Sequence, residues 1–177
     1  QQKALALTGR EPEGTLEDIF ARDGVIWLFD GVEYAPNLGF GVRTAEVSGA
    51  TAVIINVKKT HEERRTIRRA GMRATRFIPV VYATTEEILS KCNRKIVVAE
   101  DVGNKAPWET DLTGNLLIVV GAENAGVSRE VLDAASEIVR LPMPGFIPSY
   151  NLQVAVSALA IERLRQIEIV TQNDNPS

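Results

Sequence analysis

The sequence predicts an α/β fold with a mostly parallel sheet flanked by helices. Six short segments are nearly continuous runs of β-branched and aliphatic residues, which is typical of strands buried on both faces of a parallel sheet. Segments with helical character separate these runs, and such alternation indicates an α/β architecture. The expected strands comprise residues 25–30, 51–56, 78–83, 95–100, 115–121 and 137–142.

Helices are expected between the strands, where capping residues mark their ends. Residues 44–50 are expected to end the first helix. Thr60 and Glu63 have the spacing of a capping box for a second, basic helix, and Gly71 can close that helix. These signals place one helix after each of the first two strands.

Three further helices are predicted after the third strand. The third covers residues 84–92, and the fourth follows Ser128, which is a suitable N-cap. Ser149 is expected to cap the last helix, which runs from near Tyr150 to about Val170. The first turns of this helix are apolar almost all round, which predicts burial on most sides, in part by another subunit.

The length of 177 residues suits one domain, with a short N-terminal arm over 1–24, the main domain over 25–170 and a polar tail over 171–177. No apolar run reaches the roughly 18 residues that cross a membrane, and no leader-like segment opens the chain. A single Cys and a single His argue against a disulfide and a zinc site. We therefore expect a cytoplasmic protein without a metal ion.

Candidate functional residues are sought directly after the strands, because ligands of open α/β sheets bind beyond the carboxyl ends of the strands. After the first strand, Pro36 and Asn37 favour a turn, and Arg43 is expected in the first turn of the next helix. The helix dipole disfavours a cation there, which suggests a functional reason such as binding a phosphate. The alternative is a surface arginine paired with Glu46 or Asp30.

Two further candidate segments follow the fifth and sixth strands. Glu123 lies in a loop that lacks the G-x-G-x-x-G dinucleotide fingerprint, so it either accepts hydrogen bonds from a ligand or braces its own loop. After the sixth strand, three prolines within 142–148 fix a stiff loop that leads to Ser149 and Asn151. A simple N-cap explains Ser149 but neither the prolines nor Asn151.

Together these three segments resemble the signature motifs of the SpoU (TrmH-like) family of SPOUT RNA methyltransferases. Each motif alone is weak, but all three occur in the family's order and at compatible spacing. The first motif is carried by Asn37, Gly39, Arg43, Thr44, Ala45 and Gly49, the second by Gly121, Glu123 and Gly126, and the third by Leu141, Pro142, Met143, Gly145, Ser149 and Asn151.

The resemblance implies an S-adenosylmethionine-dependent enzyme that methylates a ribose 2′-hydroxyl of ribosomal or transfer RNA. It also implies a deep trefoil knot in the C-terminal part of the sheet and an obligate homodimer. The knotted loops would bind the cofactor through Gly121, Leu141, Met143 and Tyr150. Arg43 would bind the phosphate beside the ribose, and the hydroxyl and the loops would be oriented by Asn37, Glu123, Ser149 and Asn151.

A basic segment contrasts with the acidic remainder of the chain. Residues 58–76 contain eight Lys or Arg and two Glu, a local charge of +6 in a chain whose net charge is −3. Such asymmetry suggests a polyanionic partner, and a solvated helix face is the alternative. In a methyltransferase of this family the segment would contact RNA phosphates through Lys58, Lys59, Arg64, Arg65, Arg68, Arg69 and Arg73.

Two positions depart from the family pattern. Tyr150 stands where the family usually has Leu, and Arg73 stands where small residues are common. Two other functions compete with the enzyme. A catalytically inactive RNA-binding or assembly protein could share the fold, but the retained motif residues argue against it. A nucleotide-dependent enzyme such as a dehydrogenase is disfavoured because the G-x-G-x-x-G fingerprint is missing.

Overall fold

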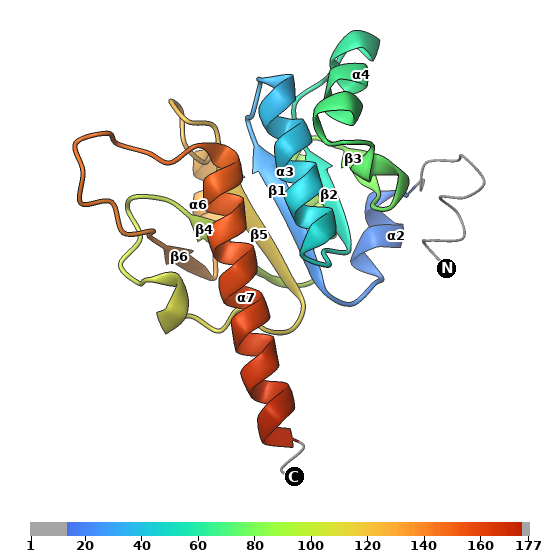
Figure 1. Ribbon diagram of the computed structural model, residues 1–177. Helices are drawn as coiled ribbons and strands as arrows, with labels where there is room; N and C mark the ends of the chain where they lie inside the picture. The colour runs from blue at the N-terminus through green and yellow to red at the C-terminus, as the bar shows by residue number, and fades with distance from the viewer. Residues whose placement is uncertain (1–13, 175–177) are drawn as a thin grey trace.

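The computed structural model describes residues 14–174, which form three layers (Figure 1). A six-stranded parallel sheet in the order β3-β2-β1-β5-β4-β6 is the middle layer. Helices cover both faces of this sheet. The predicted α/β fold with a parallel sheet is therefore confirmed.

All six predicted strands are present, and each lies within the expected residues. Their side chains alternate between two cores because successive residues of a strand point to opposite faces. In β1, Trp27 and Phe29 pack into one core, whereas Ile26 and Leu28 pack into the other. The strands are β1 Val25–Asp30, β2 Ala52–Ile55, β3 Val80–Tyr82, β4 Lys95–Ala99, β5 Leu116–Gly121 and β6 Glu137–Val139.

The helices divide between the two faces of the sheet according to the core they cover. Helices α3, α4 and α7 pack on the face that contains Trp27, and α2, α5 and α6 pack on the opposite face. The helices are α2 Leu16–Phe20, α3 Ala35–Val47, α4 His61–Ala70, α5 Thr85–Lys91, α6 Arg129–Ala134 and α7 Leu152–Asp174, and the short 3₁₀ helices are η1 Ala74–Arg76 and η2 Pro107–Glu109.

Helix α3 begins earlier than the sequence suggested. The sequence suggested that Pro36 lies in a loop turn before the helix, but it lies in the first turn of α3. A proline fits there because a backbone N–H at this position would have no helical partner. Arg43 is consequently the ninth residue of the helix, and its predicted place in the first turn is wrong. The dipole argument for a functional Arg43 is thereby removed.

The start of α7 also differs from the prediction. The helix begins at Leu152, and the side chain of Asn151 caps it by accepting a hydrogen bond from the Gln153 amide at 3.1 Å. Ser149 precedes the cap residue, so its predicted capping role is wrong. An asparagine at the cap satisfies the same free amide that a serine would. At its other end α7 continues to Asp174, beyond the expected end near Val170.

The connection from β4 to β5 crosses the end of β6. The Glu100 amide donates to the Val139 carbonyl at 3.0 Å, and the Arg140 amide donates to the Lys105 carbonyl at 2.8 Å. Gly103 makes this crossing possible, because a Cβ there would lie 2.6 Å from the Val139 carbonyl carbon. The crossing is consistent with the predicted trefoil knot, which itself stays a prediction.

The predicted division into arm, domain and tail is not tested by the structure and stays a prediction. Residues 1–13 of the arm and 175–177 of the tail lie outside the described residues. In the described part of the arm, Leu16, Ile19 and Phe20 of α2 are buried in the core on the second face of the sheet. This helix therefore belongs to the packed body of the protein.

A buried carboxylate connects the central strand with two loops at the carboxyl edge of the sheet. Asp30, the last residue of β1, is only 2% exposed. Its Oδ2 accepts a hydrogen bond from the Ser128 amide at 2.6 Å, and its Oδ1 accepts one from Asn56 Nδ2 at 2.5 Å. The Asn56 Oδ1 in turn accepts from the Gly31 amide at 2.8 Å. The carboxylate thus holds the loop after β5 and the end of β2 against β1.

We predict that Asp30→Asn lowers the free energy of unfolding by about 2 kcal/mol, as expected for buried hydrogen bonds to a charged group. The new NH2 group would face another hydrogen-bond donor, either the Ser128 amide or the Asn56 side chain. Urea denaturation measures the change. Asp133→Asn is the control, because Asp133 forms an exposed ion pair with Arg129 and should cost less than about 0.5 kcal/mol. Equal losses in the two variants would contradict the prediction.

Candidate functional site

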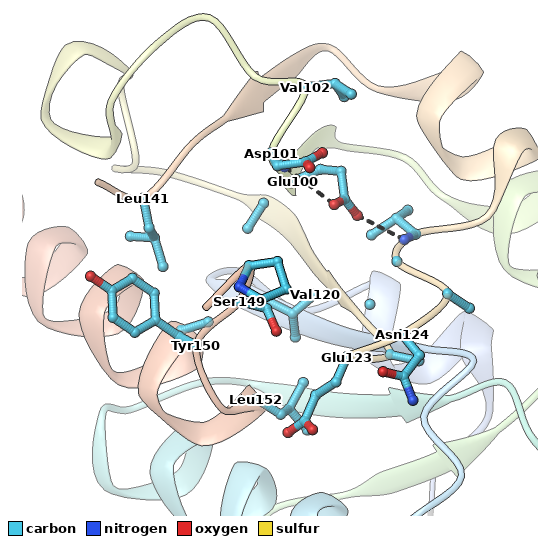
Figure 2. A pocket seen from close by; sticks show the side chains of 18 of the residues that line it. Glu100, Asp101, Val102, Val120, Glu123, Asn124, Leu141, Ser149, Tyr150 and Leu152 are labelled. Atoms are coloured by element: carbon cyan, nitrogen blue, oxygen red, sulfur yellow. Dashed lines mark hydrogen bonds between the residues drawn. The ribbon is translucent and has the colours of Figure 1, made fainter. Parts of the chain in front are cut away.

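A cavity of about 550 Å³ opens at the carboxyl edge of the sheet, where β4 and β5 end (Figure 2). Three loops surround it, one after β4, one after β5 and one between β6 and α7. The first turn of α7 closes it through Leu152 and Ala155. This is the place where ligands bind in open parallel sheets, and the volume is in the range of small-molecule sites.

The structure brings six of the sequence-predicted residues together around this cavity. All four residues expected to contact the cofactor line it, namely Gly121, Leu141, Met143 and Tyr150. Two expected catalytic residues, Glu123 and Ser149, line it as well. Figure 2 shows Leu141 and Tyr150 on one side of the cavity and Glu123 and Asn124 on the opposite side.

Two glycines make the loop after β5 compact enough to form one wall. A Cβ at Gly121 would lie 2.4 Å from the carbonyl carbon of Gly126, so no larger residue fits while the loop keeps this conformation. Gly126 has a φ of +67°, which favours glycine. Its amide donates to the Ala122 carbonyl at 2.8 Å and closes the turn. The motif glycines are therefore explained by close approach of the backbone.

Glu100, which was not predicted from the sequence, braces the same wall from the end of β4. Its Oε2 accepts a hydrogen bond from the Val127 amide at 2.9 Å, and its Oε1 accepts from the Asp101 amide at 3.2 Å (Figure 2). A Cβ at Gly126 would lie only 2.7 Å from Glu100 Oε2. The signal that could have found this residue is its position directly after the apolar run of β4.

The other three expected catalytic residues lie outside the cavity lining. Asn37 in α3 donates from Nδ2 to Glu123 Oε1 at 3.4 Å, so it touches a residue of the lining. Asn151 caps α7. Arg43 is exposed on α3, and among residues 14–174 its side chain forms no hydrogen bond or ion pair, neither with Glu46 nor with Asp30. Its guanidinium is thus available to a ligand.

The basic helix α4 is fixed to α3 by a close backbone contact. A Cβ at Gly39 in α3 would lie 2.6 Å from the Ile67 carbonyl oxygen and 2.9 Å from the Gly71 amide nitrogen. Ile67, the buried residue of α4, enters the core on this face of the sheet. The two helices can therefore approach closely, and α4 turns its charged residues outward.

Four of the seven predicted RNA-contacting residues belong to α4, and Lys58 and Arg73 are exposed residues that flank this helix in the sequence. Arg68 is partly buried, and exposed Arg64 stacks on the ring of Tyr82 at 4.1 Å. The other exposed residues of the set are Lys58, Arg65, Arg69 and Arg73. A surface with several exposed cations is suited to a polyanion.

Lys59 has to be removed from the predicted set. Its side chain is fully buried, with Nζ donating to the Glu33 carbonyl at 2.5 Å and forming ion pairs with the Glu33 and Glu63 carboxylates. A buried ammonium is retained only where such partners replace water.

The capping box of α4 is formed as predicted. The Glu63 amide donates to Thr60 Oγ1 at 3.2 Å, and the Thr60 amide donates to Glu63 Oε2 at 2.7 Å. The hydrogen bond from the Thr60 amide lowers the pKa of Glu63, with smaller contributions from the Thr60 hydroxyl and from Lys59. The helix therefore keeps an anionic first turn, which suits its dipole, and its arginines follow in the later turns.

Residues 14–174 contain no group of three or more His, Cys, Asp or Glu that could hold a metal ion. Cys92 is half-buried against the core, and this burial raises the pKa of its thiol. None of the helices within the described part of the chain is long and apolar enough to span a bilayer.

Comparison with known proteins gives relatives for most of the chain. The RlmB protein of Pseudomonas aeruginosa, named 23S rRNA (guanosine-2'-O-)-methyltransferase, is 34% identical over 161 residues, which cover 87% of this chain and 65% of that protein. The RlmB protein of Pseudomonas putida is 33% identical over 149 residues, covering 82% of this chain and 60% of the relative. The chain thus spans about 60 to 65% of the length of these relatives.

Solved structures agree with this relationship. An AdoMet-bound rRNA methyltransferase from Sinorhizobium meliloti matches 88% of this chain and 62% of its own, with a TM-score of 0.80 and 26% identity. An RNA 2'-O ribose methyltransferase matches 81% of this chain and 56% of its own, with a TM-score of 0.74 and 29% identity. The family model described as "SpoU rRNA Methylase family" matches residues 24–161. The chain therefore belongs to the SpoU rRNA methylase family.

Proposed function

We propose that the chain is the catalytic part of an S-adenosylmethionine-dependent RNA 2′-O-ribose methyltransferase that acts on ribosomal or transfer RNA. The observation that carries this proposal is the cavity, because two family motifs that are distant in sequence, after β5 and after β6, line it together. The names of the relatives and the AdoMet-bound neighbour support the same reaction. Ribosomal RNA is the favoured substrate, and the cytoplasm is the expected compartment.

The cavity has chemistry that suits this cofactor. Val120, Leu141 and Met143 provide apolar surface for the nucleoside and the aliphatic carbons of this cofactor. Glu100, Asp101 and Glu123 contribute carboxylates, and the residues that line the cavity include no Lys, Arg or His. Such an environment favours a ligand with a sulfonium and an ammonium group. Bound S-adenosylmethionine would supply a methyl group attached to positively charged sulfur.

The chain's own residues would act mainly by holding the reacting groups in line. Arg43 is not assigned as the base, since a guanidinium effectively never deprotonates in proteins. Its exposed guanidinium would instead bind the phosphate beside the target ribose through two parallel hydrogen bonds. The Asn37 amide, held by Glu123, would orient the loop and the hydroxyl at the edge of the cavity.

We also infer that the protein forms a homodimer through the outer surface of α7. This surface exposes Val154, Ile161 and Leu164, which are 44%, 65% and 41% exposed. Val154 and Ile161 line a groove of about 410 Å³ together with Trp108 and Tyr150. Contiguous exposed apolar surface of this kind supports an interface between proteins.

The first prediction for the proposed function concerns Arg43 and the reaction. Arg43→Ala should keep the fold and the affinity for S-adenosylmethionine, because the residue is exposed and lies outside the cavity lining. Turnover should fall at least about 100-fold, because an incorrectly oriented ribose loses the aligned geometry. The measurement is tritium transfer from labelled S-adenosylmethionine to unmethylated ribosomal and transfer RNA, with cofactor affinity from calorimetry.

The control is Arg129→Ala, which removes another exposed arginine, located on α6 and paired with Asp133. It should transfer label at the wild-type rate. Alkaline hydrolysis of the labelled RNA should leave the label in a dinucleotide that resists alkali. This result would identify the ribose 2′-hydroxyl as the methyl acceptor. An Arg43→Ala protein with normal turnover would contradict the assignment of Arg43. Cofactor binding by the wild type without transfer to any RNA would favour the inactive RNA-binding protein.

The second prediction concerns the outward surface of α4. Arg65→Gln combined with Arg69→Gln should weaken RNA binding and reduce the slope of log K against log salt by roughly 0.7 to 0.9 for each phosphate that the variant no longer neutralises. Both residues are exposed, so the fold should be unaffected. Filter binding between low and moderate salt measures the slope, with Arg129→Gln as the control. An unchanged slope in the double variant would exclude this surface as the RNA-binding surface.

A further inference from the structure

The loop between β6 and α7, residues 141–150, has little backbone support. Among residues 14–174, no backbone–backbone hydrogen bond involves any of these ten residues. The prolines within 142–148 restrict the backbone and remove donors. Phe146 and Ile147 in the middle of the loop are exposed to solvent. The loop nevertheless forms a wall of the cavity, so another interaction has to fix its position.

A single hydrogen bond closes this loop. The Tyr150 hydroxyl donates to the Pro142 carbonyl at 2.6 Å and joins residues that are eight positions apart. No other side-chain hydrogen bond within residues 14–174 involves the loop residues from 141 to 150. The bond connects the end of the loop, next to α7, with its beginning, next to β6.

The acceptor of this bond lies where it controls the cavity wall. Pro142 is between Leu141 and Met143, the two residues from the beginning of the loop that line the cavity. The Pro142 carbonyl belongs to the peptide that precedes Met143, and the fixed φ of Pro142 links this peptide to the one that follows Leu141. The ring of Tyr150 lines the cavity itself, so the residue contributes a wall through its ring and a restraint through its hydroxyl.

We propose that Tyr150 is a positioning residue whose hydroxyl holds residues 141–150 closed, so that the cavity is formed before its ligand binds. A loop that is already ordered loses less conformational freedom on binding, and the ligand is bound more tightly. The prolines reduce the number of open conformations, which lets one hydrogen bond suffice. The identity of the ligand as S-adenosylmethionine rests on the proposed function, whereas closure of the loop does not.

The test uses Tyr150→Phe, which keeps the ring and removes the hydroxyl. Without ligand, chymotrypsin should cut after Phe146 about fivefold faster than in the wild type, because loss of one hydrogen bond raises the open population by about this factor. Mass spectrometry identifies this cut. Tyr34→Phe is the matched control, since Tyr34 is exposed and its hydroxyl makes no hydrogen bond among the described residues. Equal cleavage in wild type and Tyr150→Phe would overturn the proposal.

A second measurement tests the positioning role. In Tyr150→Phe the dissociation constant for S-adenosylmethionine should rise about fivefold, and kcat/KM for the cofactor should fall by a larger factor than kcat at saturating cofactor. Faster cleavage with an unchanged dissociation constant would overturn the positioning role, and so would a lower kcat with unchanged affinity. If the wild type binds no S-adenosylmethionine, the proposed function fails, but the cleavage of the free protein still decides whether the hydroxyl closes the loop.

Discussion

The carboxylate of Asp30 is the contact on which the geometry of the candidate site depends. It is buried at the end of the central strand and binds the Ser128 amide and the Asn56 side chain. A buried carboxylate without hydrogen bonds would cost several kcal/mol, so its donors are held firmly in place. The loop after β5 therefore has a defined position relative to β1 and β2, and the cavity has a fixed wall.

The remaining walls are positioned by contacts between segments far apart in the sequence. Glu100, at the end of β4, binds the Val127 amide and fits only because Gly126 has no side chain. The Arg163 guanidinium in α7 donates to the carbonyls of Leu112 and Gly114 and attaches the helix to the connection between β4 and β5. The cavity is thus assembled by side chains that bind backbone groups of neighbouring loops.

The sequence predicted the sheet well because strands buried on both faces leave continuous apolar runs, as in β1 and β5. It predicted residues of the cavity through motifs, since Gly121 and Met143 stand in recognisable patterns. It was wrong about Pro36 and about the cap of α7, because proline suits the first turn of a helix as well as a loop turn, and asparagine caps a helix as well as serine does. Asp30, Glu100 and the burial of Lys59 were missed because their partners are distant in sequence or lie in loops without periodicity.

Helix α3 lies between the cavity and the proposed RNA-binding surface on α4. It carries Asn37, which touches the cavity through Glu123, and the exposed Arg43. The same helix packs against α4 through the backbone contact at Gly39, which leaves no room for a larger residue between the two helices. RNA phosphates bound on α4 would therefore be held at a fixed distance from Arg43 and from the edge of the cavity. In this proposed arrangement, contacts that do not distinguish one RNA sequence from another would still determine which ribose reaches the cofactor.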